Sequence, residues 1–152
     1  MAGIDLSEEL IEAGADLLAI TDSLDMQAQG AMWVLDHALG DWRYYLVTSL
    51  VDTIGRRKTY KLLIDSFEKF KLPDSITVED VHLGSPSDIF FQLISSGIAV
   101  AGAGRAYVEN CVFNGVPFDG VIYRSVMSSP TKDEARRIEK RFGKRVRELV
   151  KA

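Results

Sequence analysis

Three cations in succession, Arg56, Arg57 and Lys58, stand where the sequence predicts the start of a helix, directly after a glycine. The amino end of a helix carries a partial positive charge and is stabilised by acidic rather than basic side chains. Backbone N–H groups at a helix start, together with Arg and Lys side chains, can instead bind a phosphate or a carboxylate. These residues are therefore a candidate anion-binding site. The alternative is that they extend into solvent and that Asp52, just before the helix, neutralises part of their charge.

A second basic segment is found in residues 130–152, which contain nine basic and four acidic residues. Its apolar periodicity predicts an amphipathic helix, with Arg137, Arg141 and Arg145 on the polar face. Such a helix can bind nucleic acid through phosphates, but glutamates interrupt the basic run and the pI of the chain is near 5.2. The sequence therefore favours docking of this helix onto its own domain or onto a second copy, and these three arginines are the candidate residues for binding a protein partner.

The charge of the chain is unevenly distributed. Residues 1–41 contain nine acidic residues and no Lys or Arg, whereas residues 42–129 contain nine of each sign. The net charge is −4. An acidic first segment and a basic last one can fold together, pair with a second copy, or present the basic segment to an acidic partner. Both segments can also be ordinary solvated helix faces.

Motifs for other chemistry are incomplete. The segment after Gly55 lacks the second glycine of a P-loop, and Gly102-x-Gly104 precedes a predicted strand instead of opening a helix. His37 and His82 have no further ligand at metal-site spacing. We therefore expect no catalytic residue, no metal and no cofactor.

An enzyme, either a hydrolase or a nuclease with a site near the first predicted hairpin, is the third alternative. Its polar side chains would have to converge from two parts of the chain. They are Asp36, His37, Asp52, His82, Ser85 and Asp88. Cys111 is the only cysteine, which excludes an internal disulfide bond, and strand alternation predicts it as a buried structural thiol.

Composition predicts an ordinary globular protein. The 152 residues are 47% hydrophobic and 26% charged, which suits a single domain over residues 1–152. The first residues are acidic and lack the basic start of a signal peptide. The longest uncharged run, between Asp88 and Arg105, is shorter than the roughly 20 apolar residues of a membrane span. Together with the single cysteine, these features predict a cytoplasmic protein that does not enter a membrane.

The hydrophobic pattern predicts an α+β fold with elements in the order α-ββ-α-β-α-ββ-α. About five strands are expected in a mixed or antiparallel sheet flanked by helices. The predicted helices cover about 7–24, 55–72, 85–97 with Ser85 as N-cap, and a last one that begins either at Ser129 or at a Thr131–Glu134 capping box. The predicted strands cover about 28–37, 42–51 and 76–83, followed by a hairpin over 105–126. Asn114–Gly115 is the favoured turn of this hairpin and Asp119–Gly120 is the alternative.

Three stretches, DWRYYLVTSLVDTIGRRKTYKLL, VEDVHLGSPSDI and NGVPFDGVIYRS, together resemble a set of short uncharacterised bacterial proteins. Those proteins share a Trp-led strand ending in LVD and a helix that starts with glycine. The resemblance covers about residues 25–126, leaves the basic last helix outside it, and implies one domain in a bacterial cytoplasm. No established activity comes with it.

The sequence thus favours a small non-enzymatic module that binds another protein chain, with a homodimer through a terminal helix or a sheet edge as one form. An anion- or nucleic-acid-binding protein that uses residues 56–58 and the basic last helix is the alternative. An enzyme comes third.

Overall fold

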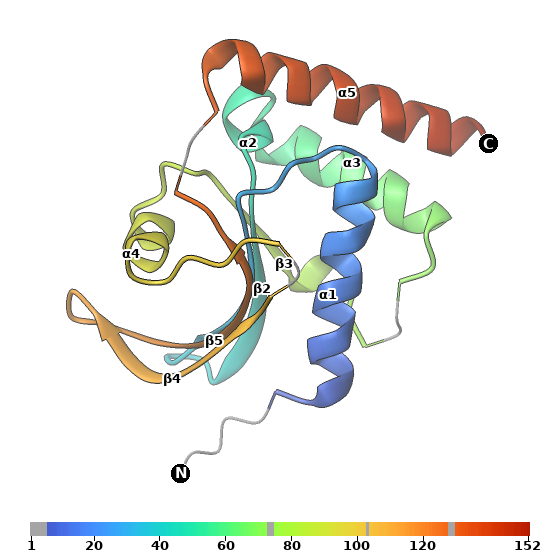
Figure 1. The fold of residues 1–152 in the computed structure, drawn as a ribbon. Coiled ribbons are helices and arrows are strands. Elements are labelled where there is room, and N and C mark those ends of the chain that lie inside the picture. The colour runs from blue at the N-terminus through green and yellow to red at the C-terminus, as the bar shows by residue number, and fades with distance from the viewer. Residues whose placement is uncertain (1–5, 73–74, 103, 128–129) are drawn as a thin grey trace.

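The computed structural model describes residues 6–72, 75–102, 104–127 and 130–152 (Figure 1). The helices are α1 (Glu8–Ser23), α2 (Leu50–Thr53), α3 (Gly55–Lys69), α4 (Ile89–Gly97) and α5 (Lys132–Lys151), with a 3₁₀ turn, η1, at Val78–Asp80. The strands are β1 (Gly30–Asp36), β2 (Asp41–Val47), β3 (Val81–Gly84), β4 (Ala106–Phe113) and β5 (Val116–Ser125).

The five strands form one mixed sheet in the order β3-β2-β1-β5-β4. Neighbouring strands are antiparallel except β2 and β3, which are parallel because α2, α3 and η1 carry the chain back to the starting edge. The predicted α+β fold with about five strands in a mixed sheet is confirmed.

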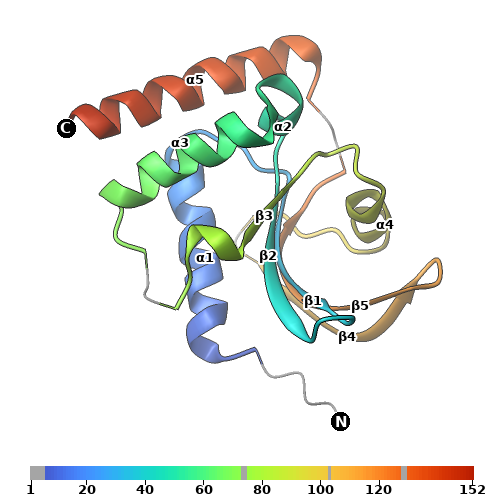
Figure 2. The ribbon, with the colours of Figure 1, turned by 180° about the vertical axis from the view of Figure 1, so that it is seen from behind.

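The sheet is curved and separates two apolar cores (Figures 1 and 2). The larger core lies between the convex face and α1, α3 and α5, and includes Tyr44, Leu63 and Phe142. The smaller core lies between the concave face and α4, and includes Tyr45 and Phe91. Consecutive residues of β2 therefore enter different cores, and the prediction that this strand is covered on both faces is confirmed.

Three buried aromatic side chains of the sheet donate hydrogen bonds to main-chain carbonyl oxygens of α1. They are Trp33 to Leu10 (2.9 Å), Tyr44 to Gly14 (2.8 Å) and Tyr123 to Ile11. Gly14 allows this approach, because a Cβ atom there would lie 2.6 Å from Trp33 Nε1 and 2.6 Å from the Tyr123 hydroxyl oxygen. The helix and the central strands are thus joined by polar contacts inside an apolar core.

Two predicted strands are shorter in the structure. The strand predicted over 42–51 ends at Val47, and the apolar residues Leu50 and Val51 are buried in the short helix α2. Because a short apolar run suits a buried helix as well as a strand, periodicity did not distinguish them. The strand predicted over 76–83 begins only at Val81, because a capping box between Thr77 and Asp80 closes η1 ahead of it.

The structure contradicts the predicted start of α4 and confirms that of α5. Helix α4 begins at Ile89 with Asp88 at the N-cap position, so Ser85 as N-cap is wrong. The capping box of α5 is confirmed, with reciprocal hydrogen bonds between Thr131 and Glu134. Ser129 lies outside the described residues. The predicted hairpin turn is confirmed, since both of its residues, 114 and 115, have positive φ.

Replacing Gly14 with alanine should destabilise the protein, although alanine is the better helix former by about 1 kcal/mol. The new Cβ atom must displace Trp33 or Tyr123 in a packed core, which typically costs about 1–3 kcal/mol. Urea unfolding of the two proteins measures the difference in the free energy of unfolding.

Gly143→Ala in α5 is the matched control. The nearest atom to a Cβ at this position is Arg147 Nη1 at 3.3 Å, the end of a flexible side chain. This variant should therefore gain up to about 1 kcal/mol in the free energy of unfolding. Equal changes in the two variants would contradict the role given to Gly14.

Candidate functional site

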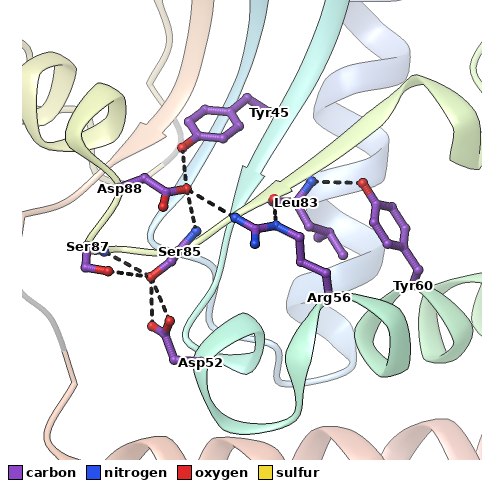
Figure 3. Close-up of polar contacts among 8 residues, drawn as sticks. All are labelled: Tyr45, Asp52, Arg56, Tyr60, Leu83, Ser85, Ser87 and Asp88. Atoms are coloured by element: carbon purple, nitrogen blue, oxygen red, sulfur yellow. Dashed lines mark hydrogen bonds and ion pairs between the residues drawn. The ribbon is translucent and has the colours of Figure 1, made fainter.

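The start of α3 covers one edge of the sheet (Figure 3). Strand β3 is an edge strand, and its outward backbone groups bond to side chains of α3. The Tyr60 hydroxyl donates to the Val81 carbonyl oxygen (2.8 Å) and accepts from the Leu83 N–H (3.1 Å). Arg56 Nε donates to the Leu83 carbonyl oxygen (3.1 Å). Arg56 therefore lies at the helix start because it satisfies an exposed backbone acceptor of the sheet.

Asp88 supplies the negative charge beside Arg56 (Figure 3). One of its carboxylate oxygens lies 3.7 Å from Arg56 Nη2 and accepts hydrogen bonds from the Tyr45 hydroxyl (3.2 Å) and the Ser85 N–H (2.9 Å). Burial and the charge of Asp88 together raise the pKa of Tyr45, so its hydroxyl remains a hydrogen-bond donor at neutral pH. Asp52, which the sequence offered as the counter-charge, instead accepts from the Ser85 hydroxyl at 2.8 and 2.9 Å.

The three cations at the start of α3 do not converge on one point. Arg56 is directed to the sheet edge, whereas Arg57 and Lys58 are exposed. Neither Arg57 nor Lys58 forms an ion pair with a described residue. Lys58 lines a groove shared with α5. The candidate anion site predicted from the sequence is thus divided between the sheet edge, the solvent and this groove.

The groove between α3 and α5 has a volume of about 410 Å³. It has an apolar part, formed by Ile54 and Leu62, next to Gly143. Charged side chains from both helices line the rest. They are the cations Lys58, Lys61, Lys140 and Arg147, and the acids Asp65 and Glu139. The groove therefore combines a small apolar surface with an excess of positive charge.

The two helices that form this groove carry most of the basic residues of the chain. Helices α3 (Gly55–Lys69) and α5 (Lys132–Lys151) contain 14 of the 18 basic and 6 of the 22 acidic residues, a net charge of +8 against −12 for the rest of the chain. The two helices lie side by side in Figures 1 and 2. The fold thereby joins two basic segments that are about 70 residues apart in the sequence into one surface.

The three arginines proposed for partner binding lie on another part of α5. Arg137, Arg141 and Arg145 are exposed, and none of them lines the groove. Arg145 Nε lies 3.1 Å from a carboxylate oxygen of Asp25, and the other two form no ion pair with a described residue.

Sequence reasoning missed the two groove cations of α5, Lys140 and Arg147, which lie with Gly143 along one side of the helix. Their spacing of three and four residues was the available signal, because such residues are neighbours on a helix surface. The sequence could not show which side α3 would meet.

Some polar residues of the enzyme alternative meet in the structure, and others do not. Asp52 and Asp88 both contact Ser85, and Asp36 and His82 line one cleft. His37 Nε2 lies 2.6 Å from Asp119 Oδ2, and Ser85 bonds to Asp52. His82 stacks on the ring of Tyr45 with centroids 5.6 Å apart. Ser85 has no histidine as a partner, so the base that activates a serine nucleophile is missing from its described contacts.

The carboxylate of Asp119 is buried at the other edge of the sheet. It accepts a 2.7 Å hydrogen bond from the Asn110 N–H, at a bulge of β4 where Asn110 has a φ of 54°, in addition to its contact with His37. Burial acts to raise the pKa of Asp119, but the Asn110 hydrogen bond and His37 outweigh it and hold this pKa below the ordinary value. The position of Asp119 and His37 is therefore explained by a structural role, because Asp119 binds the bulge of the edge strand β4.

Residues that could hold a metal ion do not cluster. Within the described ranges, no group of three His, Cys, Asp or Glu side chains could hold one. Cys111 is partly exposed, so the expectation of a buried thiol is wrong. A search of the same described ranges finds no helix that is long and apolar enough to cross a membrane.

No protein-family model, curated protein or solved structure matches this chain. The resemblance to bacterial proteins over residues 25–126 therefore stays a prediction.

Truncation of Arg56 should cost more stability than truncation of its neighbour. Arg56→Ala removes a hydrogen bond to Leu83 and the cation beside Asp88, which should lower the free energy of unfolding by about 1 kcal/mol. Arg57→Ala removes the same charge from an exposed position and should change it by less than about 0.5 kcal/mol. Urea unfolding of both variants tests this, and equal losses would mean that Arg56 does not secure the edge.

Asp119 should make stability depend on pH. Because its pKa is lowered in the folded state, its contribution is fully present above the unfolded value of about 3.9 and is lost as the pH falls through the folded value. The free energy of unfolding should therefore fall more steeply between about pH 5 and pH 2 in the unmodified protein than in Asp119→Asn. His37→Ala, which keeps the Asn110 hydrogen bond, should show an intermediate slope. Parallel curves for all three proteins would contradict this assignment.

Proposed function

We propose that the protein is a non-enzymatic binding module that holds an acidic segment of another polypeptide in the groove between α3 and α5. The observation that carries this proposal is the net charge of +8 on two adjacent helices of a chain whose total charge is −4. Charge separation of this size favours association with an acidic partner, at a rate that depends on ionic strength.

The lining of the groove favours a polypeptide over a nucleic acid. Asp65 and Glu139 would face a phosphate backbone with like charge, whereas a polypeptide can place a basic or neutral side chain beside each of them. Ile54 and Leu62 offer an apolar contact that phosphates cannot use. No aromatic ring lines the groove, so it offers no platform on which bases could stack. An amphipathic acidic helix supplies both the charges and the apolar side chains that such a groove requires.

A second copy of the chain is one partner of this kind. Helix α1 exposes Glu8, Glu9 and Asp16, and its first turn is acidic. A homodimer formed through these charges would weaken with salt. The setting that we propose for either form is a bacterial cytoplasm, which the single cysteine of the chain suits.

Binding of a labelled amphipathic peptide tests this function. The probe is a fluorescein-labelled peptide with Leu at every third and fourth position, which forms one face of a helix, and Glu on the opposite face. A Glu→Gln version of the same peptide is its control. Fluorescence anisotropy at low and high salt should show binding of the acidic peptide that weakens with salt. Lys58→Glu with Arg147→Glu should weaken it by at least about tenfold, because both charges line the groove.

Arg137→Glu with Arg141→Glu is the matched control, since it makes the same change in charge on exposed positions of α5 outside the groove. It should weaken binding by less than about threefold. Equal losses in the two double variants would contradict the groove as the site. Tighter binding of an oligonucleotide of equal charge would indicate a nucleic-acid-binding protein instead. Absence of peptide binding, with a salt-sensitive dimer in sedimentation, would assign the surface to a second copy.

A further inference from the structure

The concave face of the sheet has an opening beside α4. This helix is nine residues long and covers only part of the face (Figures 1 and 2). The space left beside it is a cleft of about 480 Å³, within the range of about 300–1,000 Å³ that is usual for small-molecule sites. Its lining comes from β1, β2, β3 and α4, and consists of Val34, Leu35, Asp36, Arg43, Tyr45, His82 and Phe90.

Aromatic and aliphatic side chains form one wall of the cleft. The rings of Tyr45 and Phe90 meet edge to face with centroids 5.6 Å apart, and Val34 packs against the same core. His82 also stacks on the ring of Tyr45. Because Tyr45 is held by Asp88 through its hydroxyl, this wall is fixed in place before any ligand enters.

The cleft contains two charged side chains, Arg43 and Asp36. Arg43 lies opposite Val34 in the β1–β2 register and is exposed. The other arginine of the sheet, Arg124, is paired with Asp22 at 2.8 Å, whereas Arg43 forms no ion pair with a described residue. The nearby carboxylate of Asp36 accepts hydrogen bonds from the N–H groups of residues 38 and 39 in the turn.

Two guanidinium groups place positive charge near His82. Burial lowers the pKa of His82, and the charges of Arg56 and Arg43 lower it further, against an opposite effect of Asp88. The imidazole is therefore mostly neutral at pH 7, and a second positive charge is disfavoured beside the guanidinium groups. An anion bound in the cleft would raise the pKa of His82 again.

We propose that this cleft binds a small aromatic anion, with its ring against Phe90, Tyr45 and Val34 and its carboxylate or sulfonate on Arg43. Apolar walls with one unpaired guanidinium match a ligand that is mostly apolar and carries one negative group. This site lies on the opposite face of the sheet from α3 and α5 (Figures 1 and 2), so it is independent of the groove that those helices form.

Fluorescent probes of matched shape test the site. 8-Anilinonaphthalene-1-sulfonate should bind, with 2-naphthoate as a competitor, and the neutral analogue N-phenyl-1-naphthylamine should bind at least about tenfold more weakly, because it cannot use Arg43. Arg43→Gln should raise the Kd of the sulfonate by about tenfold, and Arg57→Gln, an equal change of charge outside the cleft, should leave it unchanged. Equal binding by the two variants, or by the two probes, would overturn the proposal, as would absence of sulfonate binding.

The histidines provide a second readout. In the NMR titration of the unmodified protein, saturating 2-naphthoate should raise the pKa of His82, since an anion on Arg43 cancels part of the positive charge beside it. His37, which contacts Asp119 outside the cleft, serves as the internal control. A pKa of His82 that does not rise would place the anion elsewhere and overturn the proposal.

Discussion

The close approach of α1 to the sheet is the constraint on which the rest of the fold depends. Gly14 leaves room for Trp33 and Tyr123, and three aromatic donors reach the carbonyl oxygens of the helix through this gap. The donors come from β1, β2 and β5, which are the three inner strands. Because the helix is attached to all of them, it closes the convex core and fixes the spacing of the strands that carry the concave one.

Both outer strands are protected from pairing with further strands, each in a different way. At β3, Arg56 and Tyr60 occupy the outward backbone groups. At β4, a bulge at Asn110 interrupts the ladder and turns one N–H inward to Asp119. Exposed edges invite aggregation, and such devices are the usual remedies. Several polar side chains that suggest a chemical role in the sequence therefore have a structural one, because they bind backbone groups of the two outer strands.

The sequence predicted the order of the elements and the two-sided burial of β2, because both follow from local periodicity. It did not predict why Arg56 follows Gly55, since its partners, Leu83 and Asp88, are distant in the sequence and meet it only after the crossover to β3. It also did not show which cations of α5 would line a shared groove, because the apolar stripe of the helix shows which side is buried but not which element lies beside it. The partners of Arg56 and the lining of the groove both depend on contacts between residues that are distant in the sequence, and composition does not show such contacts.

The separation of charge between the α3/α5 layer and the remainder of the molecule gives the protein a large permanent electric dipole. A body with two opposite poles experiences a torque in the field of any charged surface and turns before it makes contact. Near an acidic surface the basic helices would lead, and the acidic residues of α1 would trail. Orientation of this kind shortens the rotational search that limits most protein encounters, and it would vanish once the salt concentration reduces the Debye length to a few ångströms.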